Sequence, residues 1–300
     1  MMDIALTDSI LSFAIPAKHC RGRVVRLGPA LDEILAAHAY PPLIRDILAE
    51  AVCLTAMLGA LLKDEGSQLT LQAQTEAGVI SLLACDYKDG ALRGYVEFDR
   101  ERFASQPVAP SLMALFGKGY LAITFDLPEP RGRNQGIVPL EGGSLSEAVQ
   151  NYFFQSEQIP TLIRVAVDAT AEGVSAGGLL VQHLPEGEEG RERLHVQLDH
   201  PEWEHVEIMG STVTPAELTG TALPLEDILW RLFSESDEVM VLNGKPCVKG
   251  CRCNEDHIRD VIARFPKEDK DDMVDQDGNI AIDCAFCSKT FTISGASLNN

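Results

Sequence analysis

Basic side chains are scarce in this sequence of 300 residues. It has 25 Lys and Arg against 45 Asp and Glu, which gives a formal net charge of −20 at pH 7. Proteins that bind DNA or RNA without sequence preference neutralise the phosphates with Lys and Arg. The charge balance therefore argues against nonspecific nucleic-acid binding, and we expect no nucleic-acid partner.

Long apolar runs are also lacking. The longest strongly apolar stretch runs from Ala51 to Leu62, between Glu50 and Lys63, and a bilayer takes about 20 apolar residues to cross. This stretch is therefore expected to be a core helix. The chain begins Met-Met-Asp, which is unlike a signal or transit peptide. We expect a cytoplasmic protein that makes no membrane contact.

Signatures of nucleotide-binding enzymes and hydrolases are missing as well. Gly117-Lys118-Gly119 lacks the remaining residues of a phosphate-binding loop and is interpreted as a turn. No hydrolase triad is evident. The polar run Gln155-Ser156-Glu157-Gln158 is better explained by packing at a helix end than by an active site. We expect that the protein is not an enzyme.

Two close pairs of cysteines stand near the C-terminus. Cys251 and Cys253 have one residue between them, Cys284 and Cys287 have two, and thirty residues separate the pairs. Residues i and i+2 of an extended segment point to the same side, so the first pair can offer two sulfurs to one ion. The second pair has the spacing of a metal-binding knuckle.

Four thiolates around one ion suit zinc or an iron–sulfur cluster, because soft sulfur ligands select those metals. A closed set of four protein ligands is typical of a structural site, since a catalytic zinc keeps one position open. The alternatives are four unrelated buried thiols or resting disulfides. Close spacing argues against the first, and 8 cysteines in 300 residues without a secretion signal argue against the second.

Other potential ligands lie near the quartet or elsewhere in the chain. Cys247 is an additional thiol that could compete as a ligand, form a disulfide with Cys251, or be idle; we favour the idle role. His257 could replace one cysteine, although four thiolates already complete the shell. His195, His200 and His205 are five residues apart and share no helical face, so we expect them in a solvated linker. Cys20, Cys53 and Cys85 are interpreted as structural thiols.

The first 185 residues predict an α+β domain with a mostly antiparallel sheet. Helical periodicity indicates helices over 29–37 and 42–63, and a capping box, Ser144 to Glu147, predicts a third that places 152–154 partly against the core. The residues over 128–136 are interpreted as a loop. Short turns between period-two segments favour antiparallel pairing. Strands are expected over 23–27, 69–75, 79–86, 92–98, 120–126, 161–168 and 178–184, the last two joined through Gly173, Gly177 and Gly178.

Two smaller regions follow a domain boundary at the glycine- and glutamate-rich run over 185–190. Residues 186–235 carry twelve acidic and three basic side chains and form a mainly helical acidic linker, in which 223–233 is an amphipathic helix that needs a partner to fold against. Residues 236–300 form a small zinc-binding module. In it, Asn254 caps a helix that Pro266 ends, 275–278 is a turn, and a hairpin carries Cys284 and Cys287 at its tip.

The chain resembles the redox-regulated thirty-three-kilodalton heat-shock chaperones. The resemblance is carried first by Cys251-Arg-Cys253, thirty residues, and Cys284-Ala-Phe-Cys287, the pattern of that family's zinc switch. Four further signatures carry it: Gln135-Gly136-Ile137-Val138, the run from Tyr152 to Thr161, Gly177-Gly178-Leu179-Leu180, and Leu229-Trp230-Arg231-Leu232-Phe233.

The resemblance implies an ATP-independent holdase for unfolding client proteins. The reduced form, with one zinc bound by Cys251, Cys253, Cys284 and Cys287, would be inactive. Oxidation would pair Cys251 with Cys253 and Cys284 with Cys287, release the zinc and activate the chaperone, with dimerisation on activation. Cys247 is not part of the family pattern, so the resemblance does not decide whether it is a ligand, a disulfide partner of Cys251 or idle.

The physical chemistry of the sequence agrees with such a switch. A structural zinc contributes an apparent ~10–16 kcal/mol to folding its module, whereas a segment of this size has about 3–5 kcal/mol from its own core. The competing hypothesis is an enzyme or adaptor whose zinc ribbon is permanent and docks a partner. A zinc-dependent nucleic-acid binder is opposed by the charge.

Overall fold

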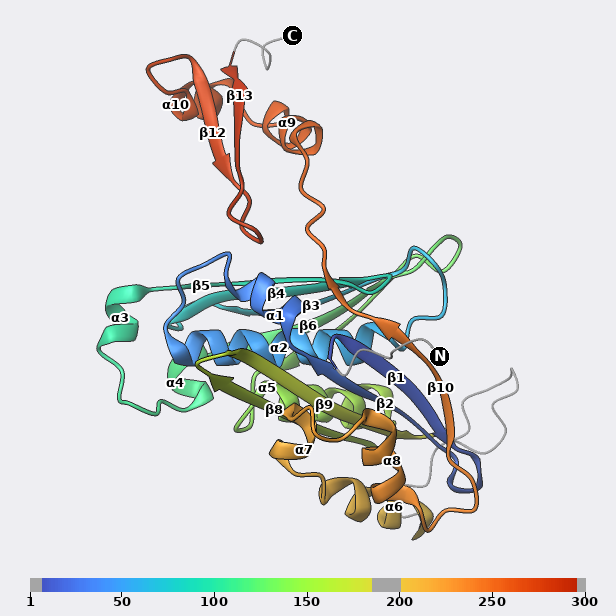
Figure 1. The fold of residues 1–300 in the computed structure, drawn as a ribbon. Helices are drawn as coiled ribbons and strands as arrows, with labels where there is room; N and C mark the ends of the chain where they lie inside the picture. Colours follow the sequence, from blue (N-terminus) through green and yellow to red (C-terminus); the bar gives the residue numbers. More distant parts are fainter. Residues whose placement is uncertain (1–6, 185–200, 296–300) are drawn as a thin grey trace.

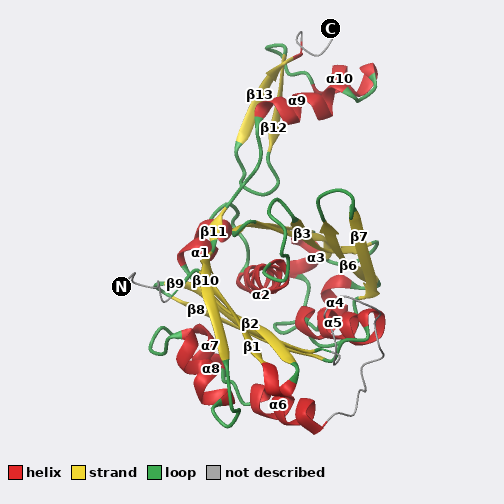
Figure 2. Cartoon of the chain, turned by 90° about the vertical axis from the view of Figure 1, so that its right-hand side faces the viewer, coloured by secondary structure: helices red, strands yellow, loops and turns green. Residues whose placement is uncertain are grey.

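The computed structural model describes residues 7–184 and 201–295, without the side chains of Asn243 and His257. Two sheets face each other across the long helix α2 (Pro42–Gly59), and three further helices cover the outer face of one sheet (Figures 1 and 2). A small unit that ends in the hairpin β12–β13 projects from the body (Figure 1). The fold is α+β, as predicted.

Almost every strand pair in the two large sheets is antiparallel. The five-stranded sheet has the order β10-β1-β2-β9-β8 and the six-stranded sheet the order β11-β5-β4-β3-β6-β7; among the described residues only β11 and β5 pair in parallel. The strands are β1 Ser9–Ile15, β2 Cys20–Leu27, β3 Gln68–Thr75, β4 Ile80–Lys88, β5 Ala91–Phe98, β6 Gly119–Asp126, β7 Arg133–Pro139, β8 Thr161–Thr170, β9 Gly173–His183, β10 Met240–Pro246, β11 Val248–Lys249, β12 Asn279–Asp283 and β13 Thr290–Ser294.

The helices lie mainly between the sheets, on the outer face of the five-stranded sheet and in the small projecting unit (Figures 1 and 2). They are α1 Pro29–Leu35, α2, α3 Arg100–Ala104, α4 Leu112–Phe116, α5 Leu145–Tyr152, α6 Pro201–Ser211, α7 Pro215–Thr219, α8 Leu225–Phe233, α9 Glu255–Ala263 and α10 Lys267–Met273. None of the helices in the described ranges is long and apolar enough to cross a membrane.

Helix α2 is the centre of the main hydrophobic core. Its residues from Ile47 to Gly59, except Glu50, are buried, and they contact strands of both sheets. A helix that is apolar on all sides must be enclosed by other elements. The helix ends at Gly59, four residues before the predicted end at Lys63. A turn at Ala60 and Leu61 follows, and it leads into the loop that contains Lys63 and Asp64.

The linker helices α6–α8 pack on the outer face of the five-stranded sheet. The apolar side chains of α8 are buried against the sheet. Among them, Phe233 stacks on Phe13 of β1 with 5.7 Å between ring centroids. The guanidinium of Arg26, which is 0% exposed, donates to the main-chain oxygens of Glu217, Leu218 and Leu223 at 2.8–3.0 Å. The cluster beneath these helices comprises mainly Trp203, Val206, Leu218, Leu225, Ile228, Leu229, Leu232 and Phe233, with Leu11, Val24, Leu179 and Val181 from the sheet.

The chain after α8 returns to both large sheets before it reaches the cysteines. Strand β10 pairs with β1, and β11 pairs with β5. Both strands lie within residues 236–300, the range predicted to form the zinc-binding module. The remaining unit, from α9 to β13, has its own small cluster, in which Ile262, Ile280 and Ile293 are buried.

Several local predictions need correction. The second half of the expected loop over 128–136 is the start of β7, which pairs with β6 along its length. Gly177 and Gly178 lie inside β9, not in the connection to β8. The Ser144 hydroxyl accepts from the Glu147 amide as expected, but the Glu147 carboxylate accepts from Gly143, so the capping box is only half formed.

Further local predictions concern the aromatic run and the regions near the C-terminus. Tyr152 and Phe153 are buried as predicted, whereas Phe154 is exposed. The sequence patterns predict no helix at the position of α10. The expected boundary over 185–190, together with His195 and His200, lies outside the described residues, as does the His257 side chain.

Candidate metal centre

The two cysteine pairs are presented by short, well-defined pieces of backbone. Strand β11 ends at Lys249, and Gly250 connects it to Cys251. The Gly250 amide donates to the Leu92 oxygen at 2.8 Å, so the core fixes where the first cysteine pair begins. Cys284 and Cys287 lie in the connection of the β12–β13 hairpin. The Ser288 amide donates to the Cys284 oxygen at 2.8 Å, and Ser288 takes a positive φ of 56°, which closes the knuckle.

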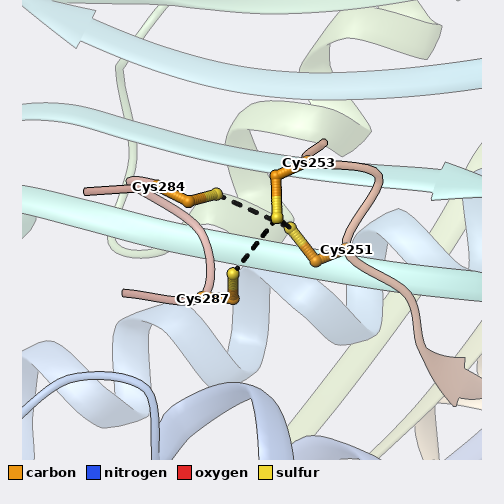
Figure 3. Close-up of side chains that lie close together, drawn as sticks. All are labelled: Cys251, Cys253, Cys284 and Cys287. Carbon is orange, nitrogen blue, oxygen red and sulfur yellow. Dashed lines mark hydrogen bonds between the residues drawn. The ribbon is translucent and has the colours of Figure 1, made fainter. Parts of the chain in front are cut away.

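The four sulfurs converge on one point (Figure 3). Sγ atoms lie 3.3 Å apart for Cys251 and Cys253, 3.6 Å for Cys251 and Cys284, and 3.5 Å for Cys253 and Cys287; all four lie within 4.8 Å of one another. A tetrahedral ion with zinc–sulfur bonds of about 2.3 Å would place its sulfurs about 3.8 Å apart. The residues therefore fit a single ion, better than a cluster that spreads its cysteines over several irons.

The cluster favours one ionised sulfur. Partial burial disfavours the Cys251 thiolate, but its interactions with the Cys253 amide and with the thiols of Cys253, Cys287 and Cys284 outweigh burial and lower the pKa of Cys251 to about 7. Burial and the hydrogen bonds donated to Cys251 raise the pKa of Cys253, and burial also raises the pKa of Cys284. Thiolates are the metal ligands, so an ion that binds here has to displace the protons that the other thiols still hold, and its affinity should rise with pH.

The core holds this site through named contacts. Arg252 donates to Asp86 at 2.9 Å, and the ring of Phe286 lies under the Arg93 guanidinium, 3.9 Å from ring centroid to guanidinium carbon. The main-chain oxygen of Ala285 lies 2.9 Å from Nε2 of His38. None of these core residues was singled out from the sequence. The sequence offers one indirect signal for these contacts: Arg252 and Phe286, which make two of them, each stand inside a cysteine pair.

The other predicted thiols lie apart from the cluster. Cys247 is 2% exposed and belongs to the main hydrophobic core, where burial raises its pKa to about 12. Cys20, Cys53 and Cys85 are buried, and burial raises the pKa of each. His205 lies on α6, 3.7 Å from the Glu235 carboxylate, away from the cysteines.

Comparison with known proteins gives a consistent result. The family model described as Hsp33 protein matches residues 8–294. A 33 kDa chaperonin of Caulobacter vibrioides is 38% identical over 306 residues, covering 98% of each chain, and a 33 kDa chaperonin of Nitrosococcus oceani is 32% identical over 288 residues, covering 95% of this chain and 90% of the other.

A solved structure has the same fold. The crystal structure of a 33 kDa chaperonin (heat shock protein 33 homolog) from Thermotoga maritima superimposes with a TM-score of 0.78 at 23% identity. It covers 97% of this chain, and this chain covers 96% of it.

Proposed function

Because this chain belongs to the Hsp33 family, we propose that it is a redox-regulated, ATP-independent holdase that binds unfolding proteins and prevents their aggregation. The similar proteins are named chaperonins, which supports a chaperone role over an enzymatic one. We further propose that it works in the cytoplasm on unfolded polypeptides and forms a homodimer when oxidised.

The reduced state would hold one zinc ion at Cys251, Cys253, Cys284 and Cys287. When bound, zinc supplies an apparent ~10–16 kcal/mol of folding free energy to such a module. The unit from α9 to β13 needs this contribution, since its hydrophobic cluster has three buried isoleucines in the described residues. The convergence of four sulfurs within 4.8 Å is the observation that carries this proposal.

Oxidation would remove the ligands from the metal. Two thiolates lose one electron each and form a disulfide, while hydrogen peroxide takes the two electrons and two protons and leaves as two waters. Pairing of Cys251 with Cys253 and of Cys284 with Cys287 uses all four ligands. The sulfurs of the first pair lie 3.3 Å apart, close enough to pair, and the choice of this pairing over the cross pairs rests on the family. Cys247 is proposed to be idle, because its thiol is buried and its raised pKa keeps it protonated.

Loss of the module would then loosen the linker helices. Strand β10 joins α8 to the cysteine segment and pairs with β1, so it connects the two regions directly. If α6–α8 leave the five-stranded sheet, the apolar side chains on both sides of this contact become available to clients. These include Leu229, Leu232 and Phe233 of α8, together with Leu11, Phe13 and Val24 of the sheet.

The test compares zinc content, thiol number and client protection in one preparation. Zinc-loaded protein is treated with peroxide under mild heat, and zinc release, free thiols and suppression of a client's aggregation are measured. We expect one zinc released, four thiols lost and aggregation suppressed only after oxidation. Zinc that survives peroxide would instead support a permanent structural ribbon. Zinc release without client protection would overturn the chaperone proposal.

A further inference from the structure

Both cysteine pairs are held by the same small area of the core. We name this area, Asp86 of β4 with Arg93 and Tyr95 of β5, the β4–β5 platform. Asp86 is 3% exposed, and its carboxylate accepts from Arg93 Nε at 2.7 Å and from the Thr70 hydroxyl at 2.7 Å. The same carboxylate accepts from Arg252, the residue between Cys251 and Cys253. The first cysteine pair is thereby fixed to β4.

The second pair reaches the platform through Phe286, which lies between Cys284 and Cys287. Its ring is covered by the Arg93 guanidinium at 3.9 Å and meets the Tyr95 ring edge-on, with centroids 4.8 Å apart and planes at 79°. Cation–π and edge-to-face contacts of this geometry are attractive, because the ring face is negative and the ring edge positive. Arg93 therefore contacts Phe286 directly and is linked to Arg252 through Asp86.

A third contact fixes the orientation of the knuckle. The Ser288 hydroxyl donates to the Ala37 oxygen at 2.7 Å, and His38 Nε2 lies 2.9 Å from the Ala285 oxygen. These contacts come from the chain just after α1, on a different element from the platform. The knuckle is thus held from two sides, which restricts how its two sulfurs can turn relative to those of Cys251 and Cys253.

The charges around the site also suit a loaded centre. Four thiolates around a divalent ion carry a net charge of −2. Arg252 stands between the first two cysteines and Arg93 covers Phe286 between the other two, so each pair has a cation next to it in the fold, and Asp86 offsets the mutual repulsion of the two cations. Groups that orient ligands and balance their charge typically change metal affinity ten- to hundredfold when they are removed.

We propose that Asp86, Arg93 and Tyr95 are positioning residues of the metal centre, which hold the two cysteine pairs in register and set the zinc affinity of the reduced protein. Resting on the proposed function, a second consequence is that the platform sets the oxidant concentration at which zinc is released. The core would then help to determine when the metal centre loses zinc, in addition to being the region whose linker contacts change afterwards.

The test measures zinc affinity in the full reduced chain by competition with a chromogenic chelator. Arg93→Ala and, on the module side, Phe286→Ala should each weaken zinc binding by about ten- to hundredfold. The zinc affinity of Arg93→Lys should lie between those of the parent and Arg93→Ala, because lysine keeps a positive charge for Asp86 but loses the planar contact with Phe286. The matched control is Arg133→Ala, which removes an exposed ion pair with Asp126 on the same sheet and should leave zinc affinity unchanged.

A double-mutant cycle separates positioning from general destabilisation. Arg252→Met and Asp86→Asn, alone and together, should show non-additive effects on zinc affinity, while thermal unfolding of the core in Arg252→Met stays as in the parent chain. Zinc affinities within twofold of the parent in Arg93→Ala and Phe286→Ala, or strictly additive effects in the cycle, would overturn the proposal. A parent chain that fails to protect clients would sink the proposed function and leave these zinc affinities interpretable.

Discussion

Arg26 is the residue that most directly fastens the linker helices to the core. Its guanidinium is completely buried and has three main-chain oxygens of the α7–α8 region as acceptors. Burial lowers the pKa of this guanidinium from its usual value, yet the group keeps its charge because arginine ionises far above neutral pH. A cation in this position replaces the water that the three oxygens would otherwise bind.

Replacing Arg26 by Met should detach the linker helices without any oxidant. Leaving buried carbonyls unpaired and losing hydrogen bonds to a charge should lower the free energy of unfolding by about 3 kcal/mol. Denaturant unfolding measures this, and suppression of client aggregation by the reduced variant should rise. Arg231→Met is the control, since the pair of Arg231 with Glu217 is partly exposed and should contribute less than about 1 kcal/mol. If Arg26→Met and Arg231→Met lowered the free energy of unfolding equally, Arg26 would not be the residue that fastens the linker helices.

Glu50 is a half-buried carboxylate at the side of the main core that the proposed switch does not use. It lies on α2, and one of its oxygens accepts from the Ser146 amide at 2.9 Å and from the Ser146 hydroxyl at 2.6 Å. Burial raises the pKa of Glu50 above its usual 4.5, and the Glu147 charge adds to this, against the opposing effect of the Ser146 hydrogen bonds. The folded state therefore binds this proton more tightly than the unfolded state.

This shift predicts a definite pH dependence for the variant Glu50→Gln. With a raised pKa, the stabilising contribution of protonated Glu50 is complete below pH 4.5 and is lost as the pH rises through the folded-state value. Glutamine keeps an oxygen for Ser146 but never ionises. The variant should therefore gain stability over the parent as the pH rises from about 4 to neutral, measured by urea unfolding. A difference that is constant with pH would contradict the assignment; Asp46→Asn, on the same helix, is the control.

At the scale of elements, the unit from α9 to β13 should be the part that depends on metal. Chelating the zinc removes an apparent ~10–16 kcal/mol, more than the about 3–5 kcal/mol that so small a core supplies. Amides of β12 and β13 should then lose protection against hydrogen exchange, while those of α2 keep it. A hairpin that stays protected without metal would show that its isoleucine cluster is sufficient.

The elements that the sequence predicts well are those whose pattern is local. Helix α2 and strands β3–β5 follow from apolar periodicity and short turns, and the convergence of the cysteines follows from their spacing. Strand β7 was hidden because its side chains are mostly exposed, so no alternation marks it. Helix α10 has no buried residue, and its charged sequence carries no apolar stripe.

Long-range pairing is what sequence patterns leave open. Nothing in the residues from Met240 to Lys249 indicates that they join β1 in one sheet and β5 in the other, because partner choice depends on segments more than a hundred residues away. The same reason hides the platform. Asp86 and Arg93 read as ordinary strand residues, and only the folded chain brings them to Arg252.

At the scale of the whole molecule, the path of the chain predicts where it can be cut. A chain ending at residue 250 retains β10 and β11 and should remain folded and soluble, with its linker helices loosened as proposed for the oxidised chain. A chain ending at residue 235 loses β10, which exposes the edge of β1 to pairing with other molecules. Light scattering after gel filtration should find aggregates of the shorter chain. Comparable behaviour of the two would show that β10 is dispensable.

The anchoring of β11 immediately before Cys251 fixes one end of everything that follows. If residues 251–300 detach, they become a tail of about 50 residues with a root-mean-square reach of about 40 Å from that anchor. Its cysteines then meet one another at an effective concentration in the millimolar range. At micromolar protein, the tail therefore encounters its own thiols far more often than those of another molecule, so reduction and metal supply can restore each chain by itself.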